Sequence, residues 1–404
     1  MPAPPVSAKD QPSHDMQTLP SNGLTVFVLL LSSLTVMANA TISPSLPGLS
    51  RNFGDTPGIE TLAGLIVSLP SLAIVLTAAG FGWAADRFDR NRLLTIALLA
   101  YALGGASGLF AQNMSQILAG RLFLGIGVAG TLTIATQVAA DHWQGPARAR
   151  FMGHQGAATS MMAIVSLLVG GALAELSWRG PFAIYSLALP LAVWLWFVMP
   201  KSGPTPAGLR DRTAVAAFPW KIMALTGGVI FAVMTFIFLI ATRLPFLLIE
   251  IGETSPAVMA VTMATMTVAS FPTGLFYGRI RARFAPPQIA IAALLLMAAG
   301  YFVVSAASSV SMVGFGILVT GTGLGAIIPN QTVWLMAHVP NNARGRASGM
   351  MTTFLFGGQF ASPFVSAALL ERTDLHGLFF WFAFGAVSIA TLLAPFALRP
   401  LENK

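Results

Sequence analysis

The chain has 404 residues, of which 55% are hydrophobic and only 9% are charged, and its mean hydropathy is +0.75. This composition is too apolar for a soluble domain and indicates a membrane protein with many spans. The absence of cysteine excludes disulfides, thiolate zinc sites and cysteine nucleophiles. The net charge of +8 lies in short segments between apolar runs, where basic residues set orientation, so we expect no nucleic-acid binding.

Twelve apolar runs along the chain are long enough to cross a hydrocarbon core about 30 Å thick. A signal peptide is the alternative interpretation of the first run, because Ala38, Asn39 and Ala40 resemble a cleavage site. However, the polar residues 1–23 lack a basic segment next to that run. We expect spans at 24–46, 61–84, 93–111, 116–139, 151–174, 181–199, 222–248, 256–277, 287–307, 310–336, 346–369 and 378–397.

The basic residues between the spans predict the orientation of the chain, because lysine and arginine are retained on the cytoplasmic side. With both termini in the cytoplasm, seventeen of the 22 basic residues lie on that side and three, Arg51, Arg179 and Arg372, lie on the other. Arg121 and Arg243 fall within the membrane or at its edge. The sequence therefore predicts an all-α membrane protein with twelve transmembrane helices and two cytoplasmic termini.

The longest polar interruption, residues 200–221, divides the predicted spans six and six. Its proline, glycine and charge are typical of a linker. We therefore expect an N-terminal six-helix bundle over 24–199 and a C-terminal six-helix bundle over 222–398. Residues 1–23 and 399–404 are the expected cytoplasmic tails.

A partial internal repeat supports this division. The pattern A-R-x-R-x-x-G occurs at 147–153 before the fifth span and at 343–349 before the eleventh, at an offset of 196 residues. At an offset of 192 residues, Gly82 and Asp86-Arg87 match Gly274 and Gly278-Arg279. Duplication of a six-span unit explains both matches, and such parallel repeats are typical of transporters.

Four short segments resemble signatures of the major facilitator superfamily. Residues 82–90, GWAADRFDR, resemble its loop signature G-x-L-a-D-r-x-G-r between the second and third spans. Residues 121–127 resemble R-x-x-q-G-x-g in the fourth span, and residues 178–182 resemble W-R-w-x-F at the entrance to the sixth. Residues 44–47, PSLP, are similar to the P-a-l-P of the twelve-span drug:proton antiporter branch.

The resemblance covers the whole chain and implies a carrier that works by alternating access, with no enzyme activity, cofactor or metal. Three features depart from the family pattern. Residues 166–171 lack the Gly-Pro of the antiporter signature, Ala40 stands where several relatives place an acidic residue, and Ala84 and Asp89 replace the leucine and second glycine of the loop signature. These departures weaken the case for antiport.

The charged loop after the second span is the predicted gating latch. A carboxylate there, Asp86, can accept hydrogen bonds from the exposed amides at the start of a helix in the other bundle. The resemblance implies that the eleventh span supplies that helix. The predicted latch consists of Gly82, Asp86, Arg87, Arg90 and Asp141, with Arg90 reaching Asp141. The alternative is a solvated basic loop that only sets topology, with Gly82 serving helix packing.

Polar residues within the spans are the candidates for the substrate cavity. No acidic residue lies in the middle of a predicted span, so Arg121 and Arg243 have no obvious carboxylate partner and favour an anionic substrate. Alternatively, Arg121 bonds to backbone carbonyls, and Arg243 extends to the membrane surface. The other candidates, each of which could equally form an interhelical hydrogen bond, are Asn39, Thr41, Gln137, Asn330, Gln331 and Gln359.

Proton coupling requires a group that changes its charge within the transport pathway. The candidates for this group are His154 early in the fifth span and Glu250 after the seventh, with Glu175 and His338 as further choices. We expect a monomeric, proton-coupled exporter of a small organic molecule in a bacterial inner membrane. The alternative is an organic-anion facilitator or symporter that works in uptake. A membrane enzyme or channel is not favoured, because no metal-ligand cluster or filter motif occurs.

Overall fold

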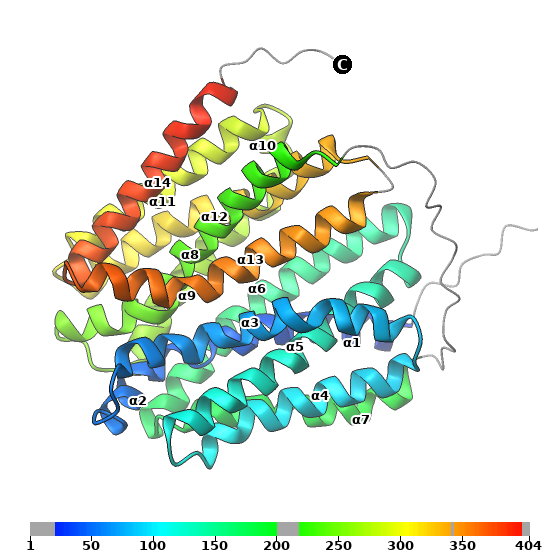
Figure 1. The fold of residues 1–404 in the computed structure, drawn as a ribbon, viewed down its shortest axis with the longest axis horizontal. Helices are drawn as coiled ribbons and strands as arrows, with labels where there is room; N and C mark the ends of the chain where they lie inside the picture. The colour runs from blue at the N-terminus through cyan, green and yellow to red at the C-terminus, as the bar shows by residue number, and fades with distance from the viewer. Residues whose placement is uncertain (1–20, 200–217, 341–342, 398–404) are drawn as a thin grey trace, which may run out of the picture.

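The computed structural model of the chain describes residues 21–199, 218–340 and 343–397. These residues form helices and no strand (Figure 1). Twelve helical segments among them are long and apolar enough to cross a membrane, which confirms the predicted all-α membrane fold. The predicted tails and the linker lie almost entirely outside the described residues.

The helices follow the predicted order along the chain. The N-terminal bundle contains α1 (Asn22–Ala40), α2 (Leu46–Asn52), α3 (Ile59–Ala85), α4 (Arg90–Ala106), α5 (Met114–His142), α6 (Gly145–Leu176) and α7 (Ala188–Val198), with the short 3-10 helices η1 (Ser43–Ser45), η2 (Ser107–Leu109) and η3 (Gly180–Leu187). The C-terminal bundle contains α8 (Trp220–Glu250), α9 (Pro256–Leu275), α10 (Tyr277–Arg281), α11 (Pro286–Ser305), α12 (Val310–His338), α13 (Arg344–Leu370) and α14 (Leu375–Ala397).

The first span is broken by its two prolines. Pro44 lies in η1 and Pro47 lies in the first turn of α2. Proline lacks a backbone N–H and clashes with the preceding turn, so two prolines three residues apart disfavour a continuous α-helix in this segment. The first span therefore consists of α1, η1 and α2 instead of one continuous α-helix.

Glycines repeat the same close packing in both bundles. Gly104 of α4 and Gly127 of α5 lie where an added Cβ would come within 2.5 Å of the partner helix. Gly300 of α11 and Gly323 of α12 occupy the same kind of position, 196 residues later in each case. Only glycine permits such an approach of two helix backbones. The glycine contacts of the two bundles are therefore separated by 196 residues, the same offset as that of the A-R-x-R-x-x-G repeat.

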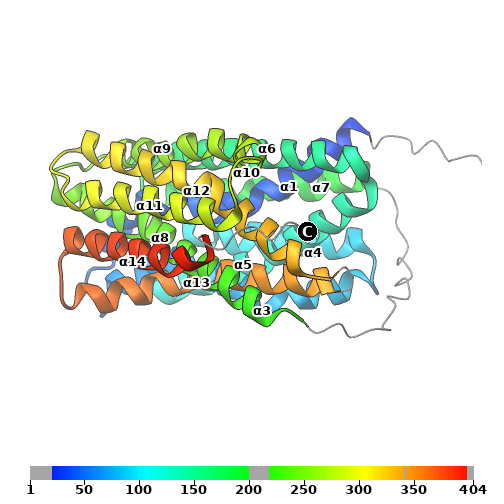
Figure 2. The same ribbon diagram turned by 90° about the horizontal axis from the view of Figure 1, so that it is seen from above.

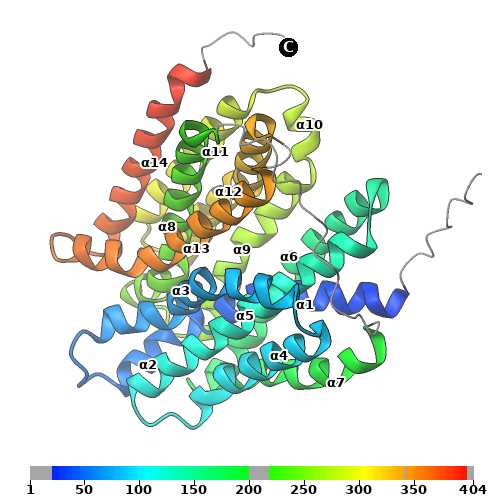
Figure 3. The same ribbon diagram turned by 45° about the vertical axis from the view of Figure 1, so that its right-hand side comes forward.

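The two bundles lie side by side. Figure 1 shows α1 to α7 in the lower part of the molecule and α8 to α14 in the upper part, and Figure 2 shows the helices running along the same long axis. Each bundle has its own hydrophobic core, to which the other bundle adds only one or two buried side chains. The contact between bundles is made mainly by two helix pairs, α3 with α13 and α6 with α9 (Figure 3).

Two faces of the molecule are named by the chain segments that they carry. The terminal face is the one at which α1 begins and α3 and α5 end. The distal face is the opposite one, where α2 connects to α3, α8 to α9 and α13 to α14 (Figure 1). The basic residues after α3 and before α13 lie on the terminal face, which the charge rule predicts to be cytoplasmic.

Candidate functional site

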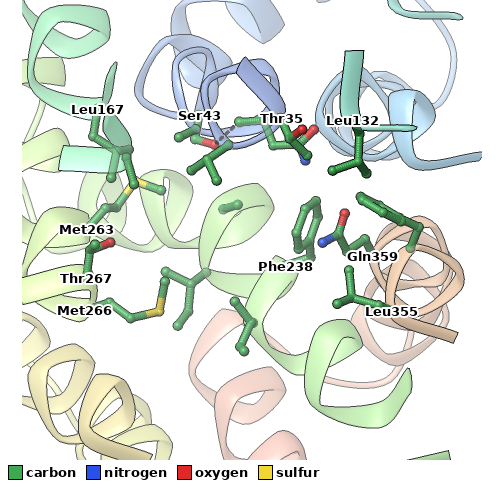
Figure 4. Close-up of a pocket in the computed structure, with 18 of the residues that line it drawn as sticks. Thr35, Ser43, Leu132, Leu167, Phe238, Met263, Met266, Thr267, Leu355 and Gln359 are labelled. Atoms are coloured by element: carbon green, nitrogen blue, oxygen red, sulfur yellow. Dashed lines mark hydrogen bonds between the residues drawn. The ribbon is translucent and has the colours of Figure 1, made fainter. Parts of the chain in front are cut away.

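A cavity of about 460 Å³ lies between the two bundles. Both bundles contribute to its wall, through α1, η1, α5 and α6 on one side and α8, α9 and α13 on the other (Figure 4). Its lining residues are Thr35, Val36, Asn39, Ala40, Ser43, Leu132, Ala163, Leu167, Ile237, Phe238, Ile240, Ala241, Met263, Met266, Thr267, Thr352, Leu355, Phe356 and Gln359. This volume accommodates a small organic molecule.

The lining contains no aspartate, glutamate, histidine, lysine or arginine. Its polar groups are hydroxyls and amides. Thr35, Asn39 and Ser43 follow one another at intervals of four residues, so they form a polar row on the first span. The Thr35 hydroxyl and the Asn39 side-chain carbonyl are buried and have no hydrogen-bond partner among the described residues. These groups are available to a bound solute.

Gln359 is the polar residue of the lining that also joins the bundles. It is 7% exposed, and its Oε1 accepts a hydrogen bond of 2.7 Å from the Ser71 hydroxyl of α3. Its Nε2 lies 3.8 Å from the Met234 sulfur, a weak acceptor. Figure 4 shows the amide nitrogen directed toward the cavity beside Phe238.

Six of the eight predicted cavity residues lie outside this lining, and four of these six are uncharged. Thr41 donates to the carbonyl of Met37 in its own helix at 2.7 Å. Gln137 of α5 is partly buried, with a buried Oε1 that has no partner among the described residues. Gln331 of α12 is fully buried, and neither of its amide atoms has a partner there either.

The fourth of these, Asn330, serves packing within the C-terminal bundle. Its Nδ2 donates to the Pro286 carbonyl at 2.8 Å, which fixes the start of α11 against α12. Its Oδ1 accepts a hydrogen bond of 3.3 Å from the Tyr277 hydroxyl of α10. Burial raises the pKa of the Tyr277 phenol, so this group keeps its proton and acts as the donor.

Arg121 is buried inside the N-terminal bundle, away from the cavity. It is 1% exposed, and its Nη1 donates to the Tyr185 hydroxyl at 3.1 Å. Its guanidinium carbon lies 4.8 Å from the ring centres of both Phe182 and Tyr185. Contact with aromatic faces stabilises a desolvated guanidinium. In this conformation, Arg121 therefore serves packing of α5 against η3.

Arg243 has a carboxylate within reach, so the expectation of an unpaired cation is wrong. Its Nη1 lies 3.8 Å from Oε2 of Glu60, which begins α3 in the other bundle. Its Nε donates to the Ser366 hydroxyl of α13 at 3.1 Å. The acidic partner comes from a segment 183 residues away in the chain. The sequence of a single span therefore could not reveal it. Arg243 thus joins three helices near the distal face.

The bundles pack tightly along α3 and α13 toward the distal face. A Cβ added to Gly64 would lie 3.0 Å from the Pro363 Cβ, so the two helices are in direct contact there. One turn further into the membrane, Ser68 and Ser362 are fully buried. The hydrogen bond from Ser71 to Gln359 follows at the level of the cavity.

The second helix pair is closed at the distal face by packing and by a carboxylate. A Cβ added to Gly171 of α6 would lie 2.5 Å from the Ala260 Cβ of α9. Glu175, near the end of α6, accepts hydrogen bonds from the Ser255 hydroxyl and, at 3.2 Å, from the Ala257 amide. These groups belong to the first turn of α9, whose amides have no partner within the helix. We call this arrangement the distal cap.

The predicted latch lies on the terminal face. Asp86 is exposed at the end of α3, and Arg87 stacks on Trp83 of its own bundle at 4.3 Å. The expected pair of Arg90 with Asp141 is present and joins α4 to α5 within one bundle. Gly82 has only a distant neighbour, a methyl group of the same bundle 3.9 Å from an added Cβ.

No hydrogen bond or ion pair between described residues joins the two bundles at this face. Gly345 and Gly349, in the first turns of α13, are exposed, and an added Cβ on either would meet open space. The same holds for Gly153 and Gly156 in the first turns of α6. The described conformation is therefore closed between the bundles on the distal face and separated on the terminal face.

The two predicted proton carriers lie outside the cavity lining. His154 is exposed near the terminal end of α6, and Glu250 is exposed at the distal end of α8. Within the described part of the chain, no group of three or more histidine, aspartate or glutamate side chains could hold a metal ion. Asn39 and Gln359 of the lining were predicted from the sequence. Thr35 and Ser43 were missed, although their four-residue spacing around Asn39 could have indicated them.

Comparisons with known proteins agree with this architecture. The chain is 25% identical over 363 residues to the class C tetracycline resistance protein of Escherichia coli, an alignment that covers 86% of this chain and 90% of that protein. It is 23% identical over 375 residues to the bacillibactin exporter of Bacillus subtilis, with the same coverage of both chains. The solved structure of the nucleoside transporter NupG superposes with a TM-score of 0.78 at 14% identity, over 92% of this chain and 99% of that one.

The family assignment rests on the sequence over nearly its whole length. Residues 28–363 match the Major Facilitator Superfamily, and residues 227–404 match it again. The second match falls on the C-terminal bundle, as expected for a repeated unit. The chain therefore belongs to the Major Facilitator Superfamily and is a transporter that crosses the membrane many times.

Proposed function

We propose that this transporter exports a small, uncharged and mainly apolar organic molecule by alternating access, in exchange for protons. The observation that supports this proposal best is the cavity between the bundles, whose lining holds no ionisable side chain. An ion placed there would lose its water without gaining an opposite charge, which costs several kcal/mol. An apolar molecule with a few hydrogen-bonding groups meets no such cost.

Alternation between two conformations follows from the two faces. In the described conformation the distal cap and the α3–α13 contact close one side, while on the other side no hydrogen bond or ion pair between described residues joins the latch to the C-terminal bundle. In the opposite conformation, Asp86 would accept hydrogen bonds from the first amides of α13, which are exposed here. The solute would enter from the terminal face and leave through the distal face.

The direction of transport is proposed from two sources. Two relatives that align over 86% of this chain are a tetracycline resistance protein and an exporter. The excess of basic residues on the terminal face favours placing that face in the cytoplasm. A carrier with this cavity would then load its solute from inside the cell, and we propose that it does so as a single chain in a bacterial inner membrane.

An organic anion is the less favoured substrate. That alternative depended on Arg121 and Arg243, which lie outside the cavity lining and have aromatic, hydroxyl or carboxylate partners. Movement of either arginine into the cavity would have to break these contacts. Transport of an organic anion would therefore contradict the proposal.

Proton exchange requires an ionisable group, and the cavity lining offers none. We propose that the coupling group lies at the contacts between bundles, where Glu60 and Glu175 each reach the other bundle. Protonation of a carboxylate weakens the hydrogen bonds and ion pairs that it accepts. His154 and Glu250, the groups predicted from the sequence, are exposed and lie outside the cavity lining, and they are the weaker candidates.

Flux in proteoliposomes with an imposed pH gradient tests this function. Tetracycline, a neutral steroid, a monovalent organic cation and an organic anion would be compared as solutes. We expect the uncharged solute to move against its gradient when protons move the other way. Transport of the anion alone, or uptake that follows the proton gradient, would contradict the proposal and favour the alternative of an anion carrier.

A further inference from the structure

Gln359 occupies two positions at once, in the cavity wall and in the contact between the bundles. Its side chain lines the cavity from α13, and its carbonyl oxygen accepts the hydroxyl of Ser71 on α3 at 2.7 Å. Both side chains are buried, with Ser71 fully so. In a buried environment this hydrogen bond fixes the orientation of the whole amide, because the carbonyl and the NH₂ group share one plane.

The other end of this amide has only a weak hydrogen-bond partner. The Gln359 Nε2 has the Met234 sulfur at 3.8 Å as its neighbour, which is a weak acceptor. Because Ser71 holds the carbonyl, Nε2 faces the cavity (Figure 4). The polar row on α1 lies in the part of the wall that the N-terminal bundle provides, where the Thr35 hydroxyl and the Asn39 carbonyl have no hydrogen-bond partner among the described residues. A solute with an oxygen acceptor would give Nε2 a stronger hydrogen-bond partner than the Met234 sulfur.

We propose that Gln359 determines specificity by donating a hydrogen bond from Nε2 to an uncharged acceptor on the solute, and that Ser71 is a positioning residue that aims this donor while the distal face is closed. The inference rests on the proposed function of the cavity as the solute site. The solute class is an apolar molecule with a carbonyl, ether or hydroxyl oxygen. Its apolar body contacts Phe238, Met263 and Met266.

This arrangement gives the cavity different affinities in the two conformations. When α3 and α13 separate on the distal side, Ser71 moves away and the Gln359 amide loses its fixed orientation. The solute must then order this side chain itself, which reduces the affinity. A ligand shifts a conformational equilibrium only through such a difference in affinity. Tight binding with the terminal face open and weaker binding with the distal face open is what an exporter requires.

The chain offers a matched pair of variants for the test. Ser71→Ala removes the hydroxyl that holds Gln359. Ser68→Ala makes the same chemical change one turn earlier on α3, at a buried hydroxyl with no hydrogen-bond partner among the described residues. The natural chain has no cysteine, so Glu175→Cys and Ser255→Cys can be joined by a short thiol cross-linker to lock the distal face closed.

Binding of tritiated progesterone to the cross-linked proteins is the measurement. Progesterone is uncharged and apolar, with two carbonyl acceptors and no hydrogen-bond donor. Its parent hydrocarbon, 5α-pregnane, serves as a competitor without an acceptor. We expect Ser71→Ala to raise the Kd for progesterone about threefold to tenfold, the effect of losing one aimed hydrogen bond. Ser68→Ala should stay within about twofold of the unsubstituted cross-linked protein, and the affinity for 5α-pregnane should not change in either variant.

Two results would overturn the role of Gln359 and Ser71 without touching the proposed function. One is an equal Kd for Ser71→Ala and Ser68→Ala in the locked protein, since the lock removes any effect through conformational populations. The other is displacement by 5α-pregnane as strong as by progesterone itself. A complete lack of progesterone binding before substitution would instead contradict the uncharged substrate class, and with it the proposed function.

Discussion

The distal and terminal faces of this transporter use the same chemistry with opposite results. On the distal face, Glu175 at the end of one helix bonds to the first turn of α9 in the other bundle. On the terminal face, Asp86 also ends a helix, but it is exposed, and the first residues of α13, 344–346, are exposed as well. An exposed carboxylate at a helix N-terminus contributes only about 0.3–1 kcal/mol. Contacts of this size can form and break in every transport cycle.

The two faces differ more in packing than in charge. The distal half has glycine contacts in which an added Cβ would lie 3.0 Å or less from the other bundle, at Gly64 and Gly171. The corresponding turns of α6 and α13 near the terminal face have glycines that meet open space. Closure of a face therefore depends first on close helix approach and second on the cap that follows it.

The largest expected effect comes from filling the distal glycine contact. Gly171→Val places a branched side chain where a Cβ alone would lie 2.5 Å from Ala260. Overpacking of this kind costs about 1–3 kcal/mol, so we expect a roughly tenfold or greater fall in transport and faster labelling of cysteines on the distal face. Gly156→Val on the same helix meets open space and is the control. Equal rates for the two variants would contradict the role of distal packing.

The next effect tests the predicted latch. Asp86→Asn removes the charge that would favour the first turn of α13 in the distal-open conformation. We expect transport to fall about threefold to tenfold, while the distal face of the resting protein stays closed to thiol reagents. Transport at the normal rate would contradict the latch and would mean that the charges of this loop only set the orientation of the chain in the membrane.

A smaller effect is expected at the distal cap. Glu175→Gln keeps an acceptor for Ser255 and Ala257 but removes the charge, so the conformational equilibrium should shift toward distal opening by about twofold to fivefold. Cysteine labelling on the distal face measures this shift. Glu371→Gln changes an exposed carboxylate after α13 on the same face and serves as the control. A shift of the same size in both variants would show a general charge effect instead of a cap.

The smallest effect on transport concerns the pair of Arg90 and Asp141, which lies within one bundle. Asp141→Asn should lower the free energy of unfolding by about 1 kcal/mol or less, because the carboxylate is 45% exposed. The ratio of distal to terminal labelling should stay unchanged. A changed ratio would mean that this pair takes part in switching between the conformations.

The fold was largely predictable from the sequence, because the length of each apolar run and the repeated motifs can be recognised from neighbouring residues in the chain. The two prolines that break the first span, Pro44 and Pro47, can also be identified directly in the sequence. The close packing of Gly104 and Gly127 was not foreseen in its details. It depends on which faces of α4 and α5 meet, and the hydropathy of single spans does not contain that information.

The site was predicted less well for a physical reason. Asn39 and Gln359 lie in the cavity wall as expected, but the partners of Arg121 and Arg243 come from distant segments. When only the span that contains a buried arginine is considered, no partner for its guanidinium is found. Tyr185 and Glu60 become neighbours only after the helices pack, so the sequence did not show them; Arg121 has no carboxylate partner among the described residues, as expected.

Distances between spin labels in proteoliposomes test the alternation of the two faces most directly. One label pair, at Asn52 and Arg372, would span the bundles on the distal face, and another, at Gln144 and Arg283, would span them on the terminal face; all four residues are exposed. When a transported solute and a proton gradient are added, the account predicts that the distal pair moves apart while the terminal pair moves together. Lengthening or shortening of both pairs together, or no change in either during transport, would contradict it.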